Sequence, residues 1–290
     1  MIEKFLEYLS IERRYSKHTV ESYRRDLAAF EVYVQEIEKD WASVGGKDLR
    51  HYLMQLSESG NKPKTINRKM SAIRSFFKFL VYIDYISQNP ASNVKSLKLP
   101  KEVNIPLSES EINHLLDHTF FEESWVGARD FLIVQLLYET GIRRAELIGI
   151  NVEDVDFEQK QIKVLGKRNK ERIIPLRNEL LQNLSTFIRK SPFAQSGGAL
   201  FTTEKGKRIY PKLVYNIVIS YLRLVTNKRK VSPHILRHSF ATNMLRHGAD
   251  INAVKEILGH SSLASTQVYT HNDINQLKKV FNQAHPREKK

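Results

Sequence analysis

The stretch Gln161-Ile-Lys-Val-Leu-Gly-Lys-Arg-Asn-Lys-Glu-Arg-Ile-Ile-Pro-Leu176 decides the fold class of this 290-residue chain. Its two ends, residues 161–165 and 172–176, are runs of β-favouring residues, and a basic segment that starts with glycine lies between them. This pattern predicts a β-hairpin with a basic turn. Because the other periodic segments have helical spacing, the sequence predicts a mainly α fold with a small antiparallel β-sheet.

Helices are predicted on both sides of the hairpin, where apolar residues recur every three or four positions. Ser108 followed by Glu111 is a capping signature that indicates the start of one helix, and a strongly apolar helix is predicted over 128–139. The helices predicted after the hairpin cover residues 178–190, 213–225, 233–247, 251–258, 263–271 and 274–282.

The first 87 residues are predicted to form a small all-helical domain. Between residues 88 and 107 the apolar periodicity is lost and three prolines punctuate a basic stretch, which indicates an interdomain linker. Residues 108–290 are then predicted to form a second domain. Four helices are expected in this first domain. The first two have apolar stripes that begin at Ile2 and at Val20, the third covers 48–56, and the fourth starts after Pro63.

The charge of the chain indicates a polyanionic partner. Lys and Arg number 46 against 32 Asp and Glu, which gives a formal charge of +14 and a pI near 9.7. Nucleic acid is the leading candidate, and a merely soluble basic surface is the alternative. Composition does not choose between them.

A cytoplasmic protein without redox chemistry is expected. The chain has no cysteine, which excludes a disulfide framework and a thiolate nucleophile. The longest apolar run, 131–137, contains Gln135 and falls far short of the ~20 residues that cross a bilayer. The first residues, with acids every few positions, are unlike a secretory signal.

The helix that starts after Pro63 has a basic face largely off its apolar stripe. Such a face suits contacts with a DNA backbone. A solvated helix face is the competing interpretation, and the sequence leaves both open. The residues of this face are Lys64, Asn67, Arg68, Lys69 and Arg74.

Four short segments together resemble the tyrosine recombinase family: Thr140-Gly-Ile-Arg-Arg-Ala-Glu-Leu147, Gly166-Lys167, His234-Ile-Leu-Arg237, and Leu258-Gly-His260 followed by Tyr269. The resemblance covers nearly the whole chain, because residues 15–27 also look like that family's core-binding domain, and it is strongest to the bacterial Xer recombinases. It implies a two-domain architecture. The parts are a helical, SAM-like core-binding domain over 1–87 and an α+β catalytic domain over 108–290, with a terminal docking helix over 273–283.

The family's pattern implies a catalytic set, with the Tyr269 hydroxyl as the nucleophile that forms a 3′-phosphotyrosine. Arg144, Ala145 and Arg168 depart from common family residues without putting a catalytic role in doubt. The six matching positions are Arg143, Lys167, His234, Arg237, His260 and Tyr269.

The residue types also make chemical sense by themselves. A phosphodiester attacked by a hydroxyl gains negative charge on its nonbridging oxygens, and the guanidiniums of Arg143 and Arg237 can meet it with paired hydrogen bonds. An ordinary surface position is the alternative for Arg237, but His234, three residues earlier, shares its helical face. A tyrosine hydroxyl, with a pKa of about 10, needs such positive neighbours or a proton acceptor to react at neutral pH.

The other residues, His260, Lys167 and Glu146, indicate less about the chemistry when each is considered alone. His260 follows a glycine that is expected to end a helix, where it can hydrogen-bond a phosphate oxygen or support the site. Lys167, in the hairpin turn, is assigned the protonation of the departing 5′ oxygen mostly by the resemblance. Glu146 is expected to hold local structure through backbone hydrogen bonds.

No cofactor or metal is predicted. A phosphotyrosine is a diester that preserves the energy of the cut bond, so resealing needs no nucleotide, and the G-x-x-x-x-G-K-[ST] loop is missing from the sequence. The pairs His114/His118 and His234/His238 have helical ligand spacing but no H-E-x-x-H glutamate.

The resemblance implies double-stranded DNA as the partner. It further implies a tetramer on two duplexes, of this chain alone or with a second Xer-type recombinase, and it leaves open whether a DNA translocase activates the complex. Resolution of chromosome or plasmid dimers is the expected role. A mobile-element integrase with the same chemistry and a catalytically idle DNA-binding protein of the same fold are the alternatives, and the complete set of six residues argues against the last. The terminal helix can dock on a neighbouring protomer or on its own domain.

Overall fold

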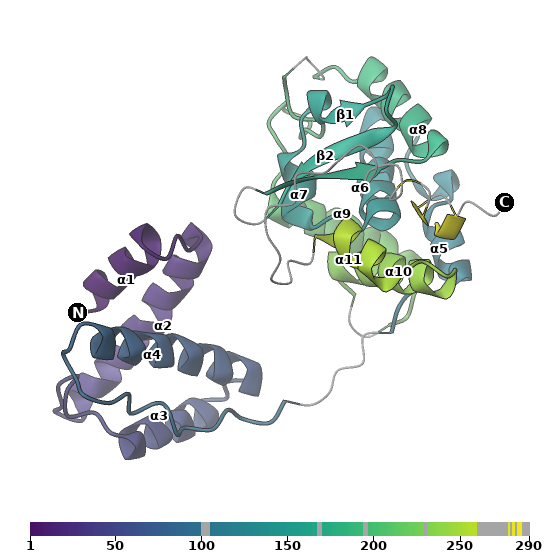
Figure 1. The fold of residues 1–290 in the computed structure, drawn as a ribbon. Coiled ribbons are helices and arrows are strands. Elements are labelled where there is room, and N and C mark those ends of the chain that lie inside the picture. The colour runs from purple at the N-terminus through teal and green to yellow at the C-terminus, as the bar shows by residue number, and fades with distance from the viewer. Residues whose placement is uncertain are drawn as a thin grey trace. The chain divides into compact units, whose positions relative to one another are not determined.

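A computed structural model describes residues 1–99, 105–166, 170–193, 197–228, 231–259, 278, 280, 281 and 283–285. The chain divides into two compact units, Met1–Glu102 and Val103–Lys290, each with its own hydrophobic core (Figure 1). The predicted fold class is confirmed: the structure is mostly helical with one small antiparallel sheet. Within these described ranges no helix is long and apolar enough to cross a membrane.

The first unit is built around its fourth helix. α4 packs against the three helices that precede it and buries Phe76 and Phe77 completely. Pro63 is its first residue, a position where the missing N–H costs no hydrogen bond. The four predicted helices are confirmed as α1 (Ile2–Ile11), α2 (Lys17–Glu36), α3 (Gly46–Glu58) and α4 (Pro63–Tyr82).

The chain that follows α4 returns along that helix. Ala91 and Val94 are buried in the core of the first unit, while Leu107 is buried in the core of the second. The Leu107 N–H donates to Ser239 Oγ at 2.8 Å. Both ends of the stretch predicted as a linker are therefore packed, and the division of the chain into a core-binding domain, a linker and a catalytic domain stays a prediction.

The second unit surrounds α6 (Trp125–Thr140), whose residues from Phe131 to Thr140 are all buried. α6 packs against α8 (Asn178–Lys190), α9 (Pro211–Val225) and α10 (Pro233–Arg246), which explains why it is apolar on every side. The other helices of this unit are α5 (Glu109–Leu115), η1 (His118–Phe120), α7 (Arg144–Gly149), η2 (Val152–Asp154) and α11 (Ile251–Leu258).

The predicted hairpin is confirmed within a three-stranded sheet. β1 (Val155–Asp156), β2 (Gln161–Leu165) and β3 (Glu171–Pro175) pair in that order, all antiparallel. β3 lies one residue earlier than predicted, because Glu171 pairs with Leu165. Leu176 instead donates its N–H to the Lys160 carbonyl at 2.8 Å.

Agreement is close for the predicted helices in the described ranges, and α8 and α11 have the predicted bounds. The helix predicted over 263–271 and most of that over 274–282 lie outside the described residues. Phe281 and His285, which are described, are buried on their own unit, where His285 Nε2 lies 3.1 Å from the Glu139 carbonyl oxygen.

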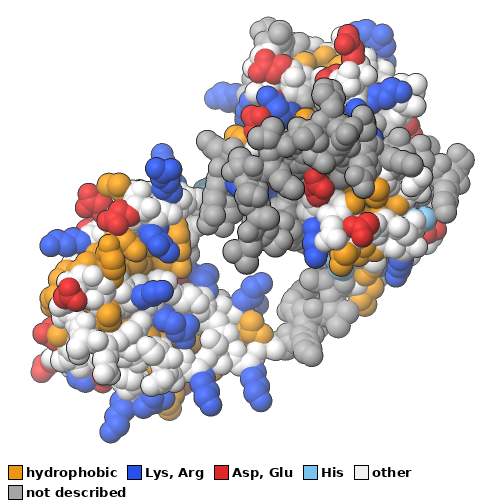
Figure 2. Space-filling view, in the orientation of Figure 1, with side chains coloured by type: hydrophobic (Ala, Val, Ile, Leu, Met, Phe, Trp, Pro, Cys, Tyr) orange, Lys and Arg blue, Asp and Glu red, His pale blue; other side chains and the backbone are white. Residues whose placement is uncertain are grey.

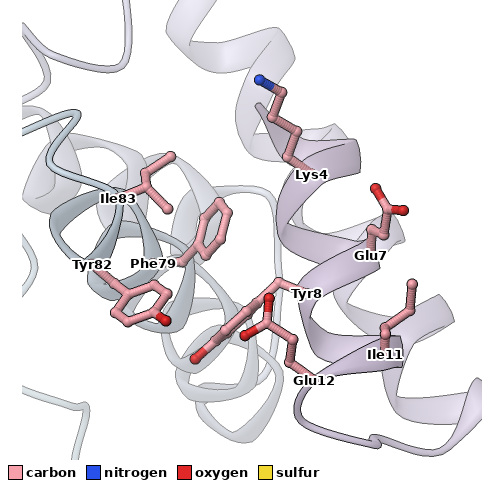
Figure 3. A pocket seen from close by; sticks show the side chains of 8 residues that line it. All are labelled: Lys4, Glu7, Tyr8, Ile11, Glu12, Phe79, Tyr82 and Ile83. Atoms are coloured by element: carbon pink, nitrogen blue, oxygen red, sulfur yellow. The ribbon is translucent and has the colours of Figure 1, made fainter.

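A groove of about 310 Å³ opens between α1 and the end of α4 (Figure 3). The Tyr8 ring packs against those of Phe79 and Tyr82, with centroids 5.1 and 5.6 Å away, while Glu7 and Glu12 edge the groove. Of the predicted catalytic residues that the structure describes, none lines this groove.

Separate cores predict separate responses to a core mutation. Ile133 is fully buried in α6, so Ile133→Ala is expected to lower the unfolding free energy of the second unit by about 2–5 kcal/mol through lost burial and a cavity. Each unit contains one tryptophan beside its core, Trp41 in the first and Trp125 in the second. Urea titrations followed by fluorescence in Trp41→Phe and Trp125→Phe backgrounds report the two units separately.

The matched control is Ile73→Ala, because Ile73 is equally buried in α4. It should shift the transition seen by Trp41 and leave that seen by Trp125. A shift of both transitions by either variant would contradict the two-core description.

Candidate functional site

The turn after α6 places the first predicted site residue. Gly141 ends α6 with a left-handed φ of 61°, and a Cβ there would lie 2.6 Å from Phe240 Cδ1 and 2.7 Å from Leu258 Cδ2. Only glycine fits this position without displacing the packing. The turn carries the chain through buried Ile142 to Arg143, the N-cap of α7.

Arg143 is tied down at its backbone and at its guanidinium. Its N–H donates to Glu146 Oε2 at 2.7 Å, so the expected structural role of Glu146 is confirmed. Arg143 Nη1 donates to Glu146 Oε1 at 2.7 Å and Nη2 donates to the Gly259 carbonyl at 3.0 Å. With its side chain 35% exposed, the guanidinium is fixed and still reachable by a ligand.

Arg237 lies on α10, which packs against α6 and α11. Its Nη1 donates to the Gly141 carbonyl at 2.5 Å and its Nη2 donates to the Leu258 carbonyl at 2.7 Å. Arg143 and Arg237 therefore donate hydrogen bonds to adjacent carbonyls, those of Gly259 and Leu258. His234, one helical turn before Arg237, is exposed.

A third arginine, Arg172 on β3, completes the arrangement. Its Nε donates to the Ile257 carbonyl at 2.8 Å, and its two Nη atoms each donate to an oxygen of the Glu146 carboxylate at 2.8 Å. The sequence prediction did not include this residue. The available signal was strand alternation, which places Arg172 on the same inward face as Ile174 and so calls for a buried partner.

The three guanidiniums satisfy three successive carbonyls at the C-terminal end of α11. Helix ends leave such carbonyls without partners, and the partial negative charge there favours cations. Each guanidinium comes from a different part of the unit, namely the N-cap of α7, β3 and α10. The end of α11 is thereby fixed against all three.

Among the residues that the structure describes, the Glu146 carboxylate lies close to three guanidiniums, those of Arg143, Arg172 and Arg237. Burial acts to raise the pKa of Glu146, but the hydrogen bonds from Arg172 and Arg143 outweigh it and lower that pKa to about 2. Burial and the nearby charges of Arg143 and Arg172 lower the pKa of Arg237 to about 10, with Glu146 opposing them. Both groups stay ionised at pH 7, and an arriving phosphate would relieve the repulsion among the arginines.

Of the six predicted catalytic residues, the structure brings Arg143 and Arg237 together and places His234 on the same helix as Arg237. Lys167, His260 and Tyr269 lie outside the described residues. Gly166 and Gly259, which immediately precede Lys167 and His260, both lie beside Arg172.

The predicted basic face of α4 has several contacts within the first unit. Asn67 exchanges two hydrogen bonds with the backbone of Leu97, and Arg74 Nη2 donates to the Val94 carbonyl at 2.9 Å. Arg68 pairs with the buried carboxylate of Asp26. Lys64 is exposed and Lys69 is half-buried. Figure 2 shows Lys and Arg side chains spread over the visible face of this unit rather than gathered in one patch.

No metal-binding arrangement is found among the residues that the structure describes, where no three His, Asp or Glu side chains are grouped to hold an ion.

Comparison with known proteins matches both units. The model of the phage integrase family matches residues 105–276, and that of the phage integrase N-terminal SAM-like domain matches residues 2–82. Tyrosine recombinase XerC of Staphylococcus carnosus is 38% identical, with 99% of this chain and 98% of that protein covered. Tyrosine recombinase XerC of Syntrophus aciditrophicus is 35% identical, with 99% and 97% covered.

The fold is shared with a solved structure of the XerH site-specific recombinase bound to its palindromic difH substrate. The TM-score is 0.73 at 22% identity, with 97% of this chain and 84% of that chain covered. At this level of identity the likeness shows the fold.

The dependence of stability on pH in acid should show how much the ionised Glu146 carboxylate stabilises the fold. Its folded pKa of about 2 lies below the ordinary 4.5, so its stabilisation is complete above about pH 4.5 and is lost as the pH falls toward 2. The shift corresponds to roughly 3 kcal/mol. Glu146→Gln is expected to be less stable at pH 7 and to lose less stability across that window, as measured by urea midpoints at stepped pH.

Glu111→Gln is the matched control. Hydrogen bonds from Lys228 and Thr226 overcome the effect of burial and also lower the pKa of Glu111 to about 2, and these partners are separate from the three arginines. Glu111→Gln should also reduce the loss of unfolding free energy between about pH 4.5 and pH 2. The reductions caused by the two single variants should add in the double variant. If Glu146→Gln left the fall in unfolding free energy below about pH 4.5 unchanged, the described pairing of Glu146 with the arginines would be contradicted.

Proposed function

This chain belongs to the phage integrase family and is a tyrosine recombinase; from that premise we propose that it cuts and rejoins DNA through a 3′-phosphotyrosine on Tyr269. The hydroxyl of Tyr269 attacks the phosphorus, the bond to the 5′ oxygen breaks, and the DNA stays on the enzyme as a diester. Attack by a 5′ hydroxyl reverses the step and joins the strand. Neither step consumes a nucleotide.

The observation that supports this proposal most strongly is the placement of Arg143 and Arg237 on adjacent carbonyls at the end of α11. Two fixed guanidiniums suit a phosphate whose nonbridging oxygens gain negative charge in the transition state. Because the guanidiniums are already held, little reorganisation accompanies the reaction.

The other predicted residues have complementary roles in the proposal. His234, exposed one turn before Arg237, accepts or donates a proton near the phosphate. His260 supports the phosphate or the site geometry, and Lys167 protonates the departing 5′ oxygen. The roles of His234, His260 and Lys167 are assigned from the matching positions in the family's catalytic pattern.

The near full-length similarity to XerC proteins supports a role in resolving chromosome or plasmid dimers at cell division, in the cytoplasm. The neighbouring XerH structure contains its DNA substrate, and this chain is proposed to bind double-stranded DNA at a specific site likewise. Strand exchange between two duplexes implies four active sites, hence a tetramer of this chain alone or with a second Xer-type recombinase. A DNA translocase is proposed as its activator.

Formation of a covalent adduct tests the proposed chemistry. The probe is a set of duplexes carrying a site selected by binding from a random-sequence library, with a nick at each successive position of one strand. The wild-type chain should form a protein–DNA adduct on one of them, visible by denaturing electrophoresis. Tyr269→Phe should bind the same duplex and form none, because it lacks the attacking oxygen. An adduct on the Phe variant would refute the assignment of Tyr269.

Arg143→Ala and Arg237→Ala extend the same test. Each should lower adduct formation by about 100-fold or more, in line with the loss of one preorganised transition-state donor. Most of the DNA affinity should remain, because many other phosphate contacts contribute to binding. An equal collapse of binding and cleavage would leave these arginines as binding residues only.

The basic face of α4 is proposed to contact the DNA backbone. Asn67, Arg68 and Arg74 also hold structure within the unit, so Lys64 and Lys69 offer the cleaner test. Replacing both lysines with alanine should weaken binding to all sequences alike. The slope of log affinity against log salt should become shallower by about 0.9 for each phosphate that a lysine no longer neutralises.

Lys4→Ala with Lys47→Ala is the matched control, since it removes the same charge from exposed positions of the same unit. It should leave the salt slope nearly unchanged. A wild-type slope for the Lys64 and Lys69 double variant would show that these two lysines do not neutralise a phosphate.

A further inference from the structure

The buried guanidinium of Arg172 lies against two glycines that lead into predicted catalytic positions. A Cβ on Gly259 would lie 3.1 Å from Arg172 Nη1, and a Cβ on Gly166 would lie 3.4 Å from the same atom. The next residue after Gly166 is Lys167, and the next after Gly259 is His260. One side chain therefore adjoins both points at which the chain enters these segments.

Arg172 is also linked to Arg143 through a shared carboxylate. Glu146 Oε1 accepts from Arg143 Nη1 at 2.7 Å and from Arg172 Nη1 at 2.8 Å. The Glu146 side chain is only 3% exposed and that of Arg172 only 6%. Without Arg172, this buried carboxylate would depend on Arg143 for its charge pairing, which would draw the Arg143 guanidinium away from a phosphate.

We infer that Arg172 is a positioning residue for strand cleavage, an inference that rests on the proposed function. It orients Arg143 through Glu146 and fixes the chain at Gly166 and Gly259. Its burial keeps it from touching DNA itself. It acts on the reaction only through these neighbours.

The contacts of Arg172 require an arginine. Its Nε binds the Ile257 carbonyl while Nη1 and Nη2 bind the two oxygens of Glu146, so three donors are used in fixed directions at once. A lysine ammonium keeps the positive charge beside Glu146 but cannot reproduce this fork. Arg172→Lys therefore separates the positioning from the charge.

The test compares single-turnover adduct rates of the wild type and Arg172→Lys on the nicked duplexes described above. Rates are taken at saturating DNA and divided by the folded fraction from thermal unfolding. We expect Arg172→Lys to be slower by about 10- to 100-fold, because a misplacement of an active-site group by about 1 Å can cost about 100-fold in rate. Its dissociation constant for the DNA should stay within about twofold, because Arg172 makes no phosphate contact.

Arg129→Lys is the matched control. Arg129 is buried in the same unit, pairs with Asp130 at 2.8 Å and donates to the Thr202 carbonyl at 3.2 Å, so it has the same kinds of partner away from the predicted catalytic set. It should lose stability and keep its adduct rate per folded molecule within about twofold of the wild type, as expected for a purely structural residue.

A double variant tests the route through Glu146. Glu146→Gln should slow the adduct rate less in the Arg172→Lys background than in the wild type, because the two residues act as one unit. If Arg172→Lys is mostly unfolded, Arg172→Gln combined with Glu146→Gln removes both buried charges together, and its adduct rate compared with that of Glu146→Gln gives the same information.

Each outcome is decisive. A slow Arg172→Lys beside a normal Arg129→Lys, with non-additive double variants, supports the inference. Equal rates for the wild type and Arg172→Lys overturn it and leave the proposed function standing. Absence of an adduct from the wild type on every duplex overturns the proposed function, and the inference with it.

Discussion

The buried carboxylate of Glu146 allows two like-charged guanidiniums to lie side by side, that of buried Arg172 and that of the partly exposed Arg143. It accepts two hydrogen bonds from Arg172 and, from Arg143, one from the guanidinium and one from the backbone N–H. Burial of an unpaired charge is costly, so each partner needs the others. The end of α11, the start of α7 and strand β3 meet at this one group.

This arrangement serves structure and chemistry with the same side chains. The arginines satisfy the carbonyls at the end of α11, and in doing so they are fixed at the place where a phosphate is proposed to bind. Burial and the neighbouring charges of Arg143 and Arg172 lower the pKa of Arg237 to about 10, and a negative charge placed beside it would raise that pKa again.

The fold followed from the sequence wherever local periodicity was strong. The hairpin and helices such as α8 and α11 were predicted because alternation and three-to-four spacing depend on nearby residues alone. The proximity of Arg143 and Arg237 could be expected only through the family resemblance, since they lie on different helices. Arg172 was missed because its partners come from α7 and α11, and no spacing rule links those to β3. Likewise, the contacts of Asn67 and Arg74 depend on the path of the chain after α4, which periodicity does not describe.

The central claim is that Arg143 and Arg237 jointly hold the phosphate that Tyr269 attacks. A crystal structure of the protein with nicked DNA and orthovanadate, which mimics a phosphate in its transition state, would test it most directly. The account predicts vanadium bonded to the Tyr269 oxygen, with both guanidiniums donating to its nonbridging oxygens. Vanadate held by other residues, with either guanidinium turned away from it, would contradict the account.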